Sequence, residues 1–393
     1  MASVALPIIR RREGVKKNRA HGARPASIAC VVAVRIEASA VDLLTVGTAF
    51  PAHRVEQSVA TGSLAALWGQ RGARVDAIER LHRSVGVEQR YLTLPIDDYT
   101  LPRSFTASND LFVRHATDLA EAAVRDALDR AGLAPSDLDM LALVTSSGLA
   151  VPSIDARLAN RLDLRRDLKR LPLFGLGCVG GAAGLARCAE YVKAFPGDVA
   201  LLVCVELCSL TFQADDTSAA NLVATGLFGD AAACAIVAGE RWATERECSR
   251  TRILGSRSVL RPNTEEVLGW RIGESGFRVV LGSELPAVAC EALRDDVDRF
   301  LTPHGLGRDD VGLWLVHPGG PKVLRSIEAA LALPSGALRY SWQGLRRLGN
   351  VSSAAVLCML REVESDGAPC GAYGLLMGMG PGFSMEMVLL HWT

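Results

Sequence analysis

The sequence predicts a layered α/β fold, because two kinds of segment alternate along the chain. Apolar runs with few charges, such as residues 139–148 and 199–209, are typical of strands buried on both faces of a sheet. Between such runs lie segments whose apolar residues recur with helical spacing, such as 118–133 and 321–332. The order of elements is similar in both parts of the chain, so we expect two related halves packed together.

The first 40 residues differ in character from the rest of the 393-residue chain. Residues 10–24, RRREGVKKNRAHGAR, are basic and lack the apolar core and cleavage site of a secretory signal. We expect residues 1–40 to be a basic, disordered extension, with a start codon placed too early as the alternative. The folded chain then divides into an N-terminal half, 41–240, and a C-terminal half, 241–393.

The expected elements follow in order along the two halves. The N-terminal half carries a helix over 118–133 that ends at Gly132, and apolar strands at 41–51, 139–148, 199–209 and 231–239. Residues 240–263 are polar and rich in arginine, and they interrupt the pattern. The pattern then resumes with helices at 286–302, 321–332 and 352–363 and strands at 311–320, 371–380 and 383–392.

Charge and cysteine content exclude several classes of protein. Lys and Arg total 43 and Asp and Glu total 43, so no net charge draws the chain to nucleic acid or to an anionic membrane. No apolar stretch is long enough for a membrane span. The ten cysteines lie mostly in apolar runs, which is typical of reduced thiols in a cytoplasmic protein. Cys204 and Cys208 lack the spacing of a zinc site, so we expect no metal.

Cys178 lies in an unusual setting. It follows the strand-like run RLPLFGLG and precedes VGGAAGLAR, in which glycine and alanine leave the first helical turn without large side chains. A thiol at a helix N-terminus meets unpaired N–H groups and the positive end of the helix dipole, and both lower its pKa. Cys178 is therefore either a small buried residue in a tight turn or a nucleophile, and the residues around it leave both interpretations open.

Two further residues could act with this thiol. His317 ends an apolar strand and enters a Pro-Gly-Gly turn, a position at which a histidine is more often structural than catalytic. Asn350 lies between Gly349 and a helix start, where an asparagine usually serves as the N-cap. A Cys, a His and an Asn, each at the end of an element and flanked by small residues, nevertheless form a set capable of thioester chemistry.

From about residue 46 to the C-terminus, the chain resembles the type III polyketide synthases, the chalcone-synthase-like branch of the thiolase superfamily. The resemblance rests on five motifs in the family's order: GLGCVGGA around Cys178, GLFGDAAA at 226–233, WLVHPGGP around His317, LGNVSSA around Asn350, and GMGPGFSME at 378–386. It implies a thiolase-like α/β fold in which two βαβαβ-type halves pack as α/β/α/β/α layers.

The resemblance also implies an acyltransferase that condenses CoA thioesters. Cys178 would carry an acyl starter as a thioester, and His317 would stabilise the thiolate as an ion pair and then help to hold the extender's carbonyl. Asn350 would donate to the enolate that forms when malonyl-CoA loses carbon dioxide. Acyl-CoA and malonyl-CoA are substrates in this scheme, and no cofactor or metal is implied.

Several other positions match residues of the family that contact substrate. Phe228 and Phe277 match two gatekeeping phenylalanines between a CoA tunnel and an inner cavity, although core packing alone would also explain them. Arg80 and Arg83 fall where basic residues grip the CoA phosphates, with solvated surface arginines as the alternative. The remaining matches are positions that line the cavity: Cys208, Thr211 and Ser352.

Within the family, the segments around Cys178 and at 268–286 look like those of bacterial enzymes that make alkylpyrones and alkylresorcinols. We therefore expect a medium- or long-chain fatty acyl starter. The alternatives are a tetrahydroxynaphthalene-type synthase that uses malonyl-CoA only, and an enzyme like ketoacyl-carrier-protein synthase III. The resemblance further implies a homodimer, with Val151 at the interface, and an acyl carrier protein or fatty-acid synthase is a candidate starter donor.

Overall fold

A mixed nine-stranded sheet runs through both halves of the chain, in the order β11-β12-β13-β8-β1-β7-β6-β4-β5. The computed structural model describes residues 41–70, 74–101, 103–244 and 251–393. The predicted basic extension, residues 1–40, lies outside these ranges, and the division into halves at residue 240 stays a prediction.

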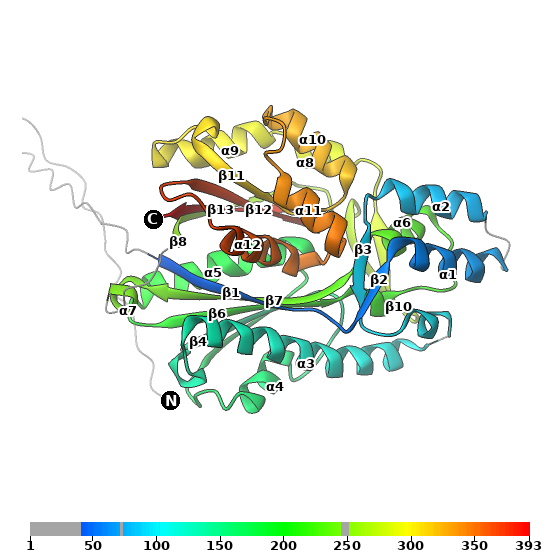
Figure 1. The fold of residues 1–393 in the computed structure, drawn as a ribbon, viewed down its shortest axis with the longest axis horizontal. Helices are drawn as coiled ribbons and strands as arrows, with labels where there is room; N and C mark the ends of the chain where they lie inside the picture. The colour runs from blue at the N-terminus through cyan, green and yellow to red at the C-terminus, as the bar shows by residue number, and fades with distance from the viewer. Residues whose placement is uncertain (1–40, 71–73, 102, 245–250) are drawn as a thin grey trace, which may run out of the picture. The chain divides into compact units, whose positions relative to one another are not determined.

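The N-terminal part of the sheet consists of β1 (Val41–Ala49), β7 (Asp230–Gly239), β6 (Val199–Leu207), β4 (Met140–Thr145) and β5 (Lys169–Phe174). β4 is parallel to β5 and β6, whereas β7 is antiparallel to β1 and β6. Figure 1 shows α3 (Phe105–Ala131) and α4 (Ile154–Arg161) on one face of these strands and α5 (Gly180–Ala194) on the other. α3 ends as predicted, with Gly132 in the left-handed conformation at φ 64°.

The C-terminal part consists of β8 (Thr251–Leu260), β13 (Ser384–Trp392), β12 (Tyr373–Gly380) and β11 (Val311–Val316). Its outer face is covered by α8 (Leu285–Cys290), α9 (Leu293–Leu301) and α10 (Pro321–Leu331), and α11 (Arg339–Leu348) leads into α12 (Ala355–Asp366). An antiparallel pairing of β1 with β8 joins this part to the N-terminal strands.

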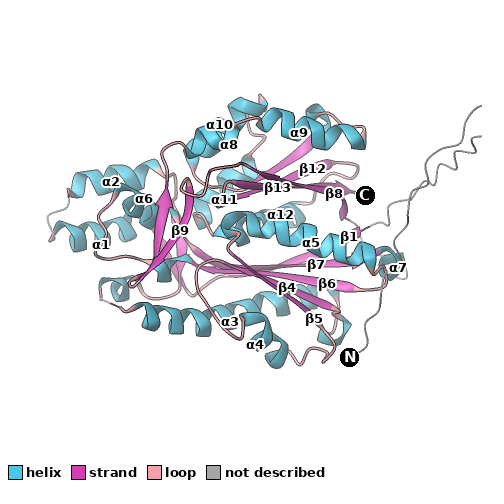
Figure 2. Cartoon of the chain, turned by 180° about the vertical axis from the view of Figure 1, so that it is seen from behind, coloured by secondary structure: helices cyan, strands magenta, loops and turns pink. Residues whose placement is uncertain are grey.

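The helices α5 and α12 form the middle layer, between the two parts of the sheet (Figure 2). One buried cluster holds residues from both helices together with residues of β1, β4, β6, β7 and the C-terminal strands. Because these strands are covered on both faces, β6 and β7 are buried along their whole length. The α/β/α/β/α layering predicted from the sequence is therefore what the structure shows.

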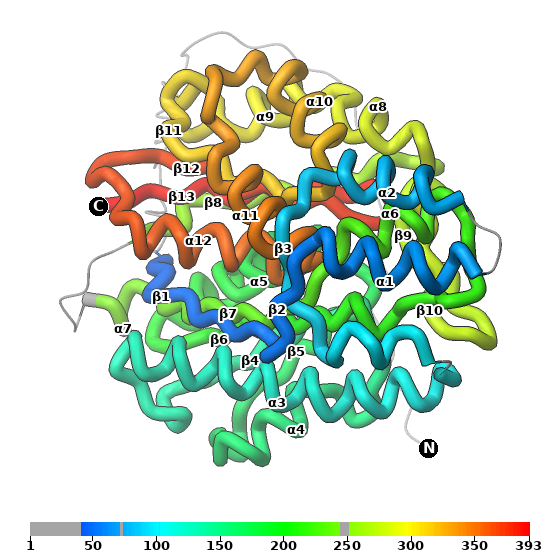
Figure 3. The backbone as a smooth tube through the Cα atoms, turned by 45° about the vertical axis from the view of Figure 1, so that its right-hand side comes forward, coloured from blue at the N-terminus to red at the C-terminus, as the bar shows by residue number. Residues whose placement is uncertain are grey.

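A smaller group of elements gathers beside the C-terminal end of α6 (Ala219–Leu227). It contains α1 (Gln57–Gly69), α2 (Val75–Ser84) and two antiparallel strand pairs, β2 (His53–Glu56) with β3 (Gln89–Leu92) and the hairpin of β9 (Leu268–Gly273) with β10 (Gly276–Leu281). Figure 3 shows how these segments, which are distant in sequence, lie together. The short α7 (Glu240–Thr244) follows β7.

Several elements differ from the sequence prediction. α3 begins at Phe105 and not at residue 118, and the following elements were not predicted: α1, α2, α4, α6, β2, β3, β9 and β10. The arginine-rich stretch contains β8, whose residues are mostly half-buried, so the apolar signal of a buried strand is missing. The helix expected at 286–302 is divided into α8 and α9, because Ala292 adopts the left-handed conformation at φ 50°. α11 was not predicted. None of the helices in the described ranges is both long and apolar enough to cross a membrane.

Candidate active site

The glycines around Cys178 allow two loops to meet at the start of α5. Cys178 lies in a 3₁₀ turn, Gly177–Val179, directly before the helix. Gly177 has φ 54°, a conformation that glycine adopts without a steric penalty. A Cβ atom at Gly181 would lie 2.1 Å from the carbonyl oxygen of Ser353, so only glycine permits this approach. Because the first turn of α5 lacks large side chains, the segment after Asn350 can pack against the thiol.

His317 follows β11, and its backbone N–H donates a 2.8 Å hydrogen bond to the carbonyl of Met377 on β12. The residue is buried, and among the described residues its Nδ1 atom has no hydrogen-bond partner. The ring lines the same pocket as Cys178 and Asn350. The structure thus brings together the three residues that the sequence singled out.

The side chain of Asn350 has a defined orientation. Its backbone N–H donates to Leu227, and its carbonyl accepts from Gly229, which ties the loop to the end of α6. The side-chain Oδ1 accepts a 2.8 Å hydrogen bond from the Ser352 N–H. This contact to the second residue onward is an Asx turn and not the expected N-cap, because Val351 occupies the N-cap position of the next 3₁₀ turn. It leaves Nδ2 as the end of the amide that can donate to a substrate.

Burial acts on both titratable groups of the pocket. It raises the pKa of the Cys178 thiol to about 11 and lowers the pKa of His317 to about 4. The effect on the thiol is opposite to the one expected from the helix N-terminus, because loss of water disfavours the isolated thiolate. If a thiolate and an imidazolium formed together, the attraction between the two charges would offset the effect of burial on both pKa values.

A buried carboxyl group lies behind the thiol. Glu206 on β6 accepts hydrogen bonds from the hydroxyls of Ser146, Ser147, Ser352 and Ser353. The Ser352 hydroxyl is also 3.5 Å from the Cys178 Sγ atom. The serine pairs in VTSSG and NVSSA are the sequence signal for this cluster, but only the fold shows that they meet at Glu206.

The pocket around Cys178 adjoins a second one, and Phe228 lines both. The second cavity, which we call the inner pocket, also has Cys208 and Thr211 in its wall, whereas Ser352, which was expected there too, is not a wall residue and donates to Glu206 instead. Phe277 lines it too and is buried. Phe228 therefore lies where the two pockets meet, and Phe277 lies in the wall of the inner one. Their gatekeeping role stays a prediction.

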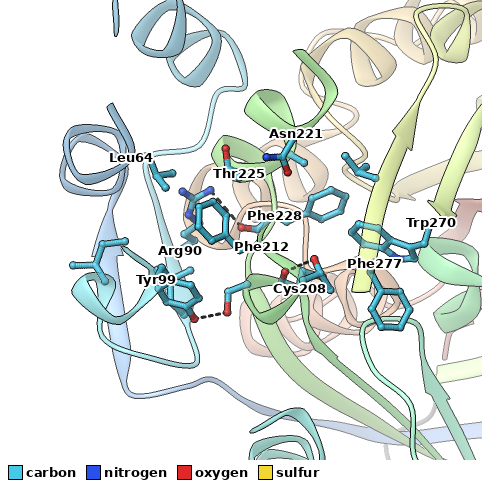
Figure 4. Close-up of a pocket in the computed structure, with 16 residues that line it drawn as sticks. Leu64, Arg90, Tyr99, Cys208, Phe212, Asn221, Thr225, Phe228, Trp270 and Phe277 are labelled. Carbon is cyan, nitrogen blue, oxygen red and sulfur yellow. Dashed lines mark hydrogen bonds between the residues drawn. The ribbon is translucent and has the colours of Figure 1, made fainter. Parts of the chain in front are cut away.

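Trp270 and Arg90 are among the wall residues of the inner pocket that the sequence analysis missed. Trp270 lies between the two phenylalanines, with ring centroids 5.9 Å from Phe228 and 6.1 Å from Phe277 (Figure 4). Arg90 on β3 lines the opposite part of the pocket. An isolated aromatic or basic residue in a short strand carries no pattern of its own, and only the fold brings these two together.

A cleft leads from the surface to Cys178, and it shares Leu227, Leu281 and Gly319 with the catalytic pocket. Arg80 and Arg83 on α2 do not lie in the wall of this cleft; both are exposed, and Arg80 pairs with Asp76. Their contact with CoA stays a prediction.

Other residues of α2 and α10 shape the cleft. Leu81 and Ser84, next to the two arginines, line it, as does Lys322. The lysine is a basic residue of the cleft that the sequence analysis missed. Val151, the predicted dimer contact, is fully exposed.

Comparison with known proteins agrees with this geometry. Residues 30–241 match the N-terminal domain of chalcone and stilbene synthases, and residues 253–393 match the C-terminal domain. A 1,3,6,8-tetrahydroxynaphthalene synthase of Streptomyces peucetius subsp. caesius is 49% identical over 348 residues, which cover 88% of this chain and 92% of that protein. A putative chalcone synthase of Bacillus subtilis is 35% identical over 360 residues, covering 89% of this chain and 98% of that protein.

A solved structure shows the same architecture. The crystal structure of the tetrahydroxynaphthalene synthase of Streptomyces coelicolor, a bacterial type III polyketide synthase, superposes with a TM-score of 0.83 at 30% identity and covers 90% of this chain and 99% of that one. The fold is therefore thiolase-like, as the resemblance implied. Family, fold and pocket agree, and the chain belongs to the chalcone and stilbene synthase family as a type III polyketide synthase, a decarboxylating, condensing acyltransferase.

Proposed function

We propose that the enzyme uses malonyl-CoA as both starter and extender and makes a tetrahydroxynaphthalene-type product. The observation that carries this proposal is the aromatic wall of the inner pocket, in which Trp270 fills the space between Phe228 and Phe277. Such a wall leaves a polyketide chain room to fold but obstructs a long alkyl chain. Relatives named as tetrahydroxynaphthalene synthases support the same reading.

The fatty acyl starter expected from the sequence, with its alkylpyrone and alkylresorcinol products, gains no support from these relatives. Of the small residues expected in the cavity, Cys208 lies in the wall of the inner pocket, whereas Ser352 is buried beside Glu206. Cys208 shares the pocket with large aromatic side chains that the sequence analysis did not place there, including Tyr99 and Phe212. The malonyl-only alternative is therefore the better reading.

In the proposed reaction, the Cys178 thiolate attacks the thioester carbonyl of malonyl-CoA and releases CoA. His317 accepts the thiol proton and remains beside the sulfur as an imidazolium. A second malonyl-CoA then loses carbon dioxide, and the resulting enolate oxygen receives hydrogen bonds from Asn350 Nδ2 and His317. The enolate carbon attacks the Cys178 thioester, the thiolate leaves, and the lengthened chain returns to the cysteine.

The test is to supply the purified enzyme with malonyl-CoA alone and, in parallel, with malonyl-CoA plus a series of acyl-CoAs, and to identify products by mass spectrometry. We expect malonyl-CoA alone to give an aromatic product faster than any fatty acyl starter does. Cys178→Ala should give no product in either reaction. A product that forms only when a fatty acyl-CoA is added would overturn the proposal.

A further inference from the structure

A buried arginine lies in the inner pocket with most of its hydrogen-bonding capacity unused. Arg90 on β3 is 2% exposed and lines the pocket opposite Trp270 (Figure 4). Its Nη1 atom donates to the carbonyl of Phe228 at 3.3 Å. Its Nε atom is buried and has no partner among the described residues. A guanidinium has five N–H donors, so this cation lacks the partners that a buried charge normally requires.

The carboxyl group that attracts this charge does not supply those partners. Asp230 attracts the charge of Arg90 but is occupied by other donors: the backbone N–H groups of Thr93 and Ser209, both at 2.8 Å, and the hydroxyls of the same two residues. Burial lowers the pKa of Arg90 to about 10, partly offset by the attraction of Asp230. The group therefore stays charged at neutral pH.

The position of this charge relative to the nucleophile has a consequence for the substrate. Phe228 lines the pocket of Cys178 and also lines the inner pocket, and its carbonyl accepts the hydrogen bond from Arg90. A chain attached to Cys178 that passes Phe228 thus brings its free end toward a guanidinium. A neutral alkyl end would leave the cation without partners, whereas a carboxylate would supply two acceptors in the geometry that a guanidinium fits.

We infer that Arg90 is the anion-binding residue of the inner pocket and holds the carboxylate at the free end of the chain while the other end is attached to Cys178. This inference rests on the proposed malonyl starter, which alone among the starters considered gives the chain an acidic end. It makes Arg90 a residue that selects the starter, because a site with unpaired donors discriminates strongly against an analogue that lacks the acceptor.

The test compares two primers of equal length, succinyl-CoA and butyryl-CoA, which differ only in a carboxylate in place of a methyl group. The rate of thioester formation on Cys178 is measured by intact-protein mass spectrometry. We expect wild type to load succinyl about tenfold to a hundredfold faster. Arg90→Gln should remove this preference with butyryl loading unchanged within about threefold, and Arg90→Lys, which keeps the charge, should retain part of it.

The matched control is Arg54→Gln, at an exposed position of β2 opposite Tyr91, which should behave as wild type. The inference is overturned if wild type shows no preference for succinyl, or if Arg90→Gln slows both primers in proportion. Thermal unfolding is measured for each variant. Should Arg90→Gln not fold, wild type and Arg90→Lys decide: an equal succinyl preference in both overturns the inference, and a reduced one in Arg90→Lys supports it.

A failure of the inference about Arg90 can be distinguished from a failure of the proposed function. If malonyl-CoA alone gives no product with wild type, the proposed malonyl starter fails, whatever the primer ratio. If malonyl-CoA alone gives the aromatic product but the preference for succinyl survives in Arg90→Gln, the starter stands and only the role of Arg90 fails.

Discussion

At the scale of single residues, the chemistry depends on whether Cys178 and His317 ionise together. Burial alone raises the pKa of the thiol above its usual value of 9.0 and lowers that of the imidazole, yet a thiolate–imidazolium pair offsets both effects. We predict that iodoacetamide labels wild type with a midpoint below pH 9. In His317→Gln no imidazolium offsets the effect of burial on the thiol, so its pKa rises and labelling should keep increasing above pH 9.

Two variants check that the label reports on the right cysteine. Cys178→Ala should not be labelled at the site, whereas Cys188→Ala, buried further along α5, should follow the wild-type profile. Identical pH profiles for wild type and His317→Gln would show that the histidine does not stabilise the thiolate.

The side-chain amide of Asn350 has two roles: its Oδ1 atom holds the turn to Ser352, and its Nδ2 atom offers a hydrogen-bond donor. One substitution separates these roles. Asn350→Asp keeps the oxygen that accepts the Ser352 N–H but removes the Nδ2 donor. We predict that this variant retains its melting temperature and still forms the acyl adduct on Cys178. Its malonyl-CoA decarboxylation should fall about a hundredfold to a thousandfold, as when one oxyanion donor is removed. Decarboxylation at the wild-type rate would mean that Asn350 only holds the turn and does not donate to the enolate.

At the scale of elements, the hairpin of β9 and β10 controls the size of the inner pocket. Its register sets Trp270 opposite Val279, and both side chains line the pocket. We predict that Trp270→Ala opens the wall, so that the rate with octanoyl-CoA rises about tenfold relative to malonyl-CoA alone. The measurement is product analysis across acyl-CoAs of increasing length.

The control for this hairpin is Arg271→Ala, the neighbouring residue, whose exposed side chain pairs with Glu266. It should leave the range of accepted starters unchanged. If Trp270→Ala also leaves that range unchanged, another element limits chain length.

At the scale of the whole molecule, a half-buried carboxyl group links the middle helix layer to the central strand. Glu364 on α12 accepts hydrogen bonds from the Val46 N–H and the Thr45 hydroxyl of β1, which pairs with both β7 and β8. Burial raises the pKa of Glu364 from 4.5 to about 7, although these hydrogen bonds and Arg361 oppose the change. The folded state therefore favours the protonated form.

The sign of the pH dependence follows. The contribution of Glu364 to the free energy of unfolding is fully present below pH 4.5 and is lost as the pH rises through about 7. The loss is at most about 1.4 kcal/mol per pH unit. We predict that Glu364→Gln flattens the free energy of unfolding between pH 5 and 7, measured with urea. Glu79→Gln, at an exposed site of α2, should keep the wild-type slope. A wild-type slope in Glu364→Gln would assign the dependence to another group.

The sequence by itself determined the alternation of layers and the three residues of the catalytic pocket. Each of Cys178, His317 and Asn350 lies in a short motif in which the backbone requires a glycine, as the positive φ angles of Gly177, Gly320 and Gly349 show. A local steric requirement leaves a local pattern, and the resemblance to a family then gave these motifs a common meaning.

Only the tertiary structure decided what surrounds that pocket. Trp270 and Arg90 come from two strand pairs far apart in the chain, and their positions depend on how β3, α6 and β9 pack. β8 was missed because a half-buried strand carries arginines among its apolar residues. The aromatic wall and the buried charge of the inner pocket are set by long-range packing, which no pattern within a single segment records.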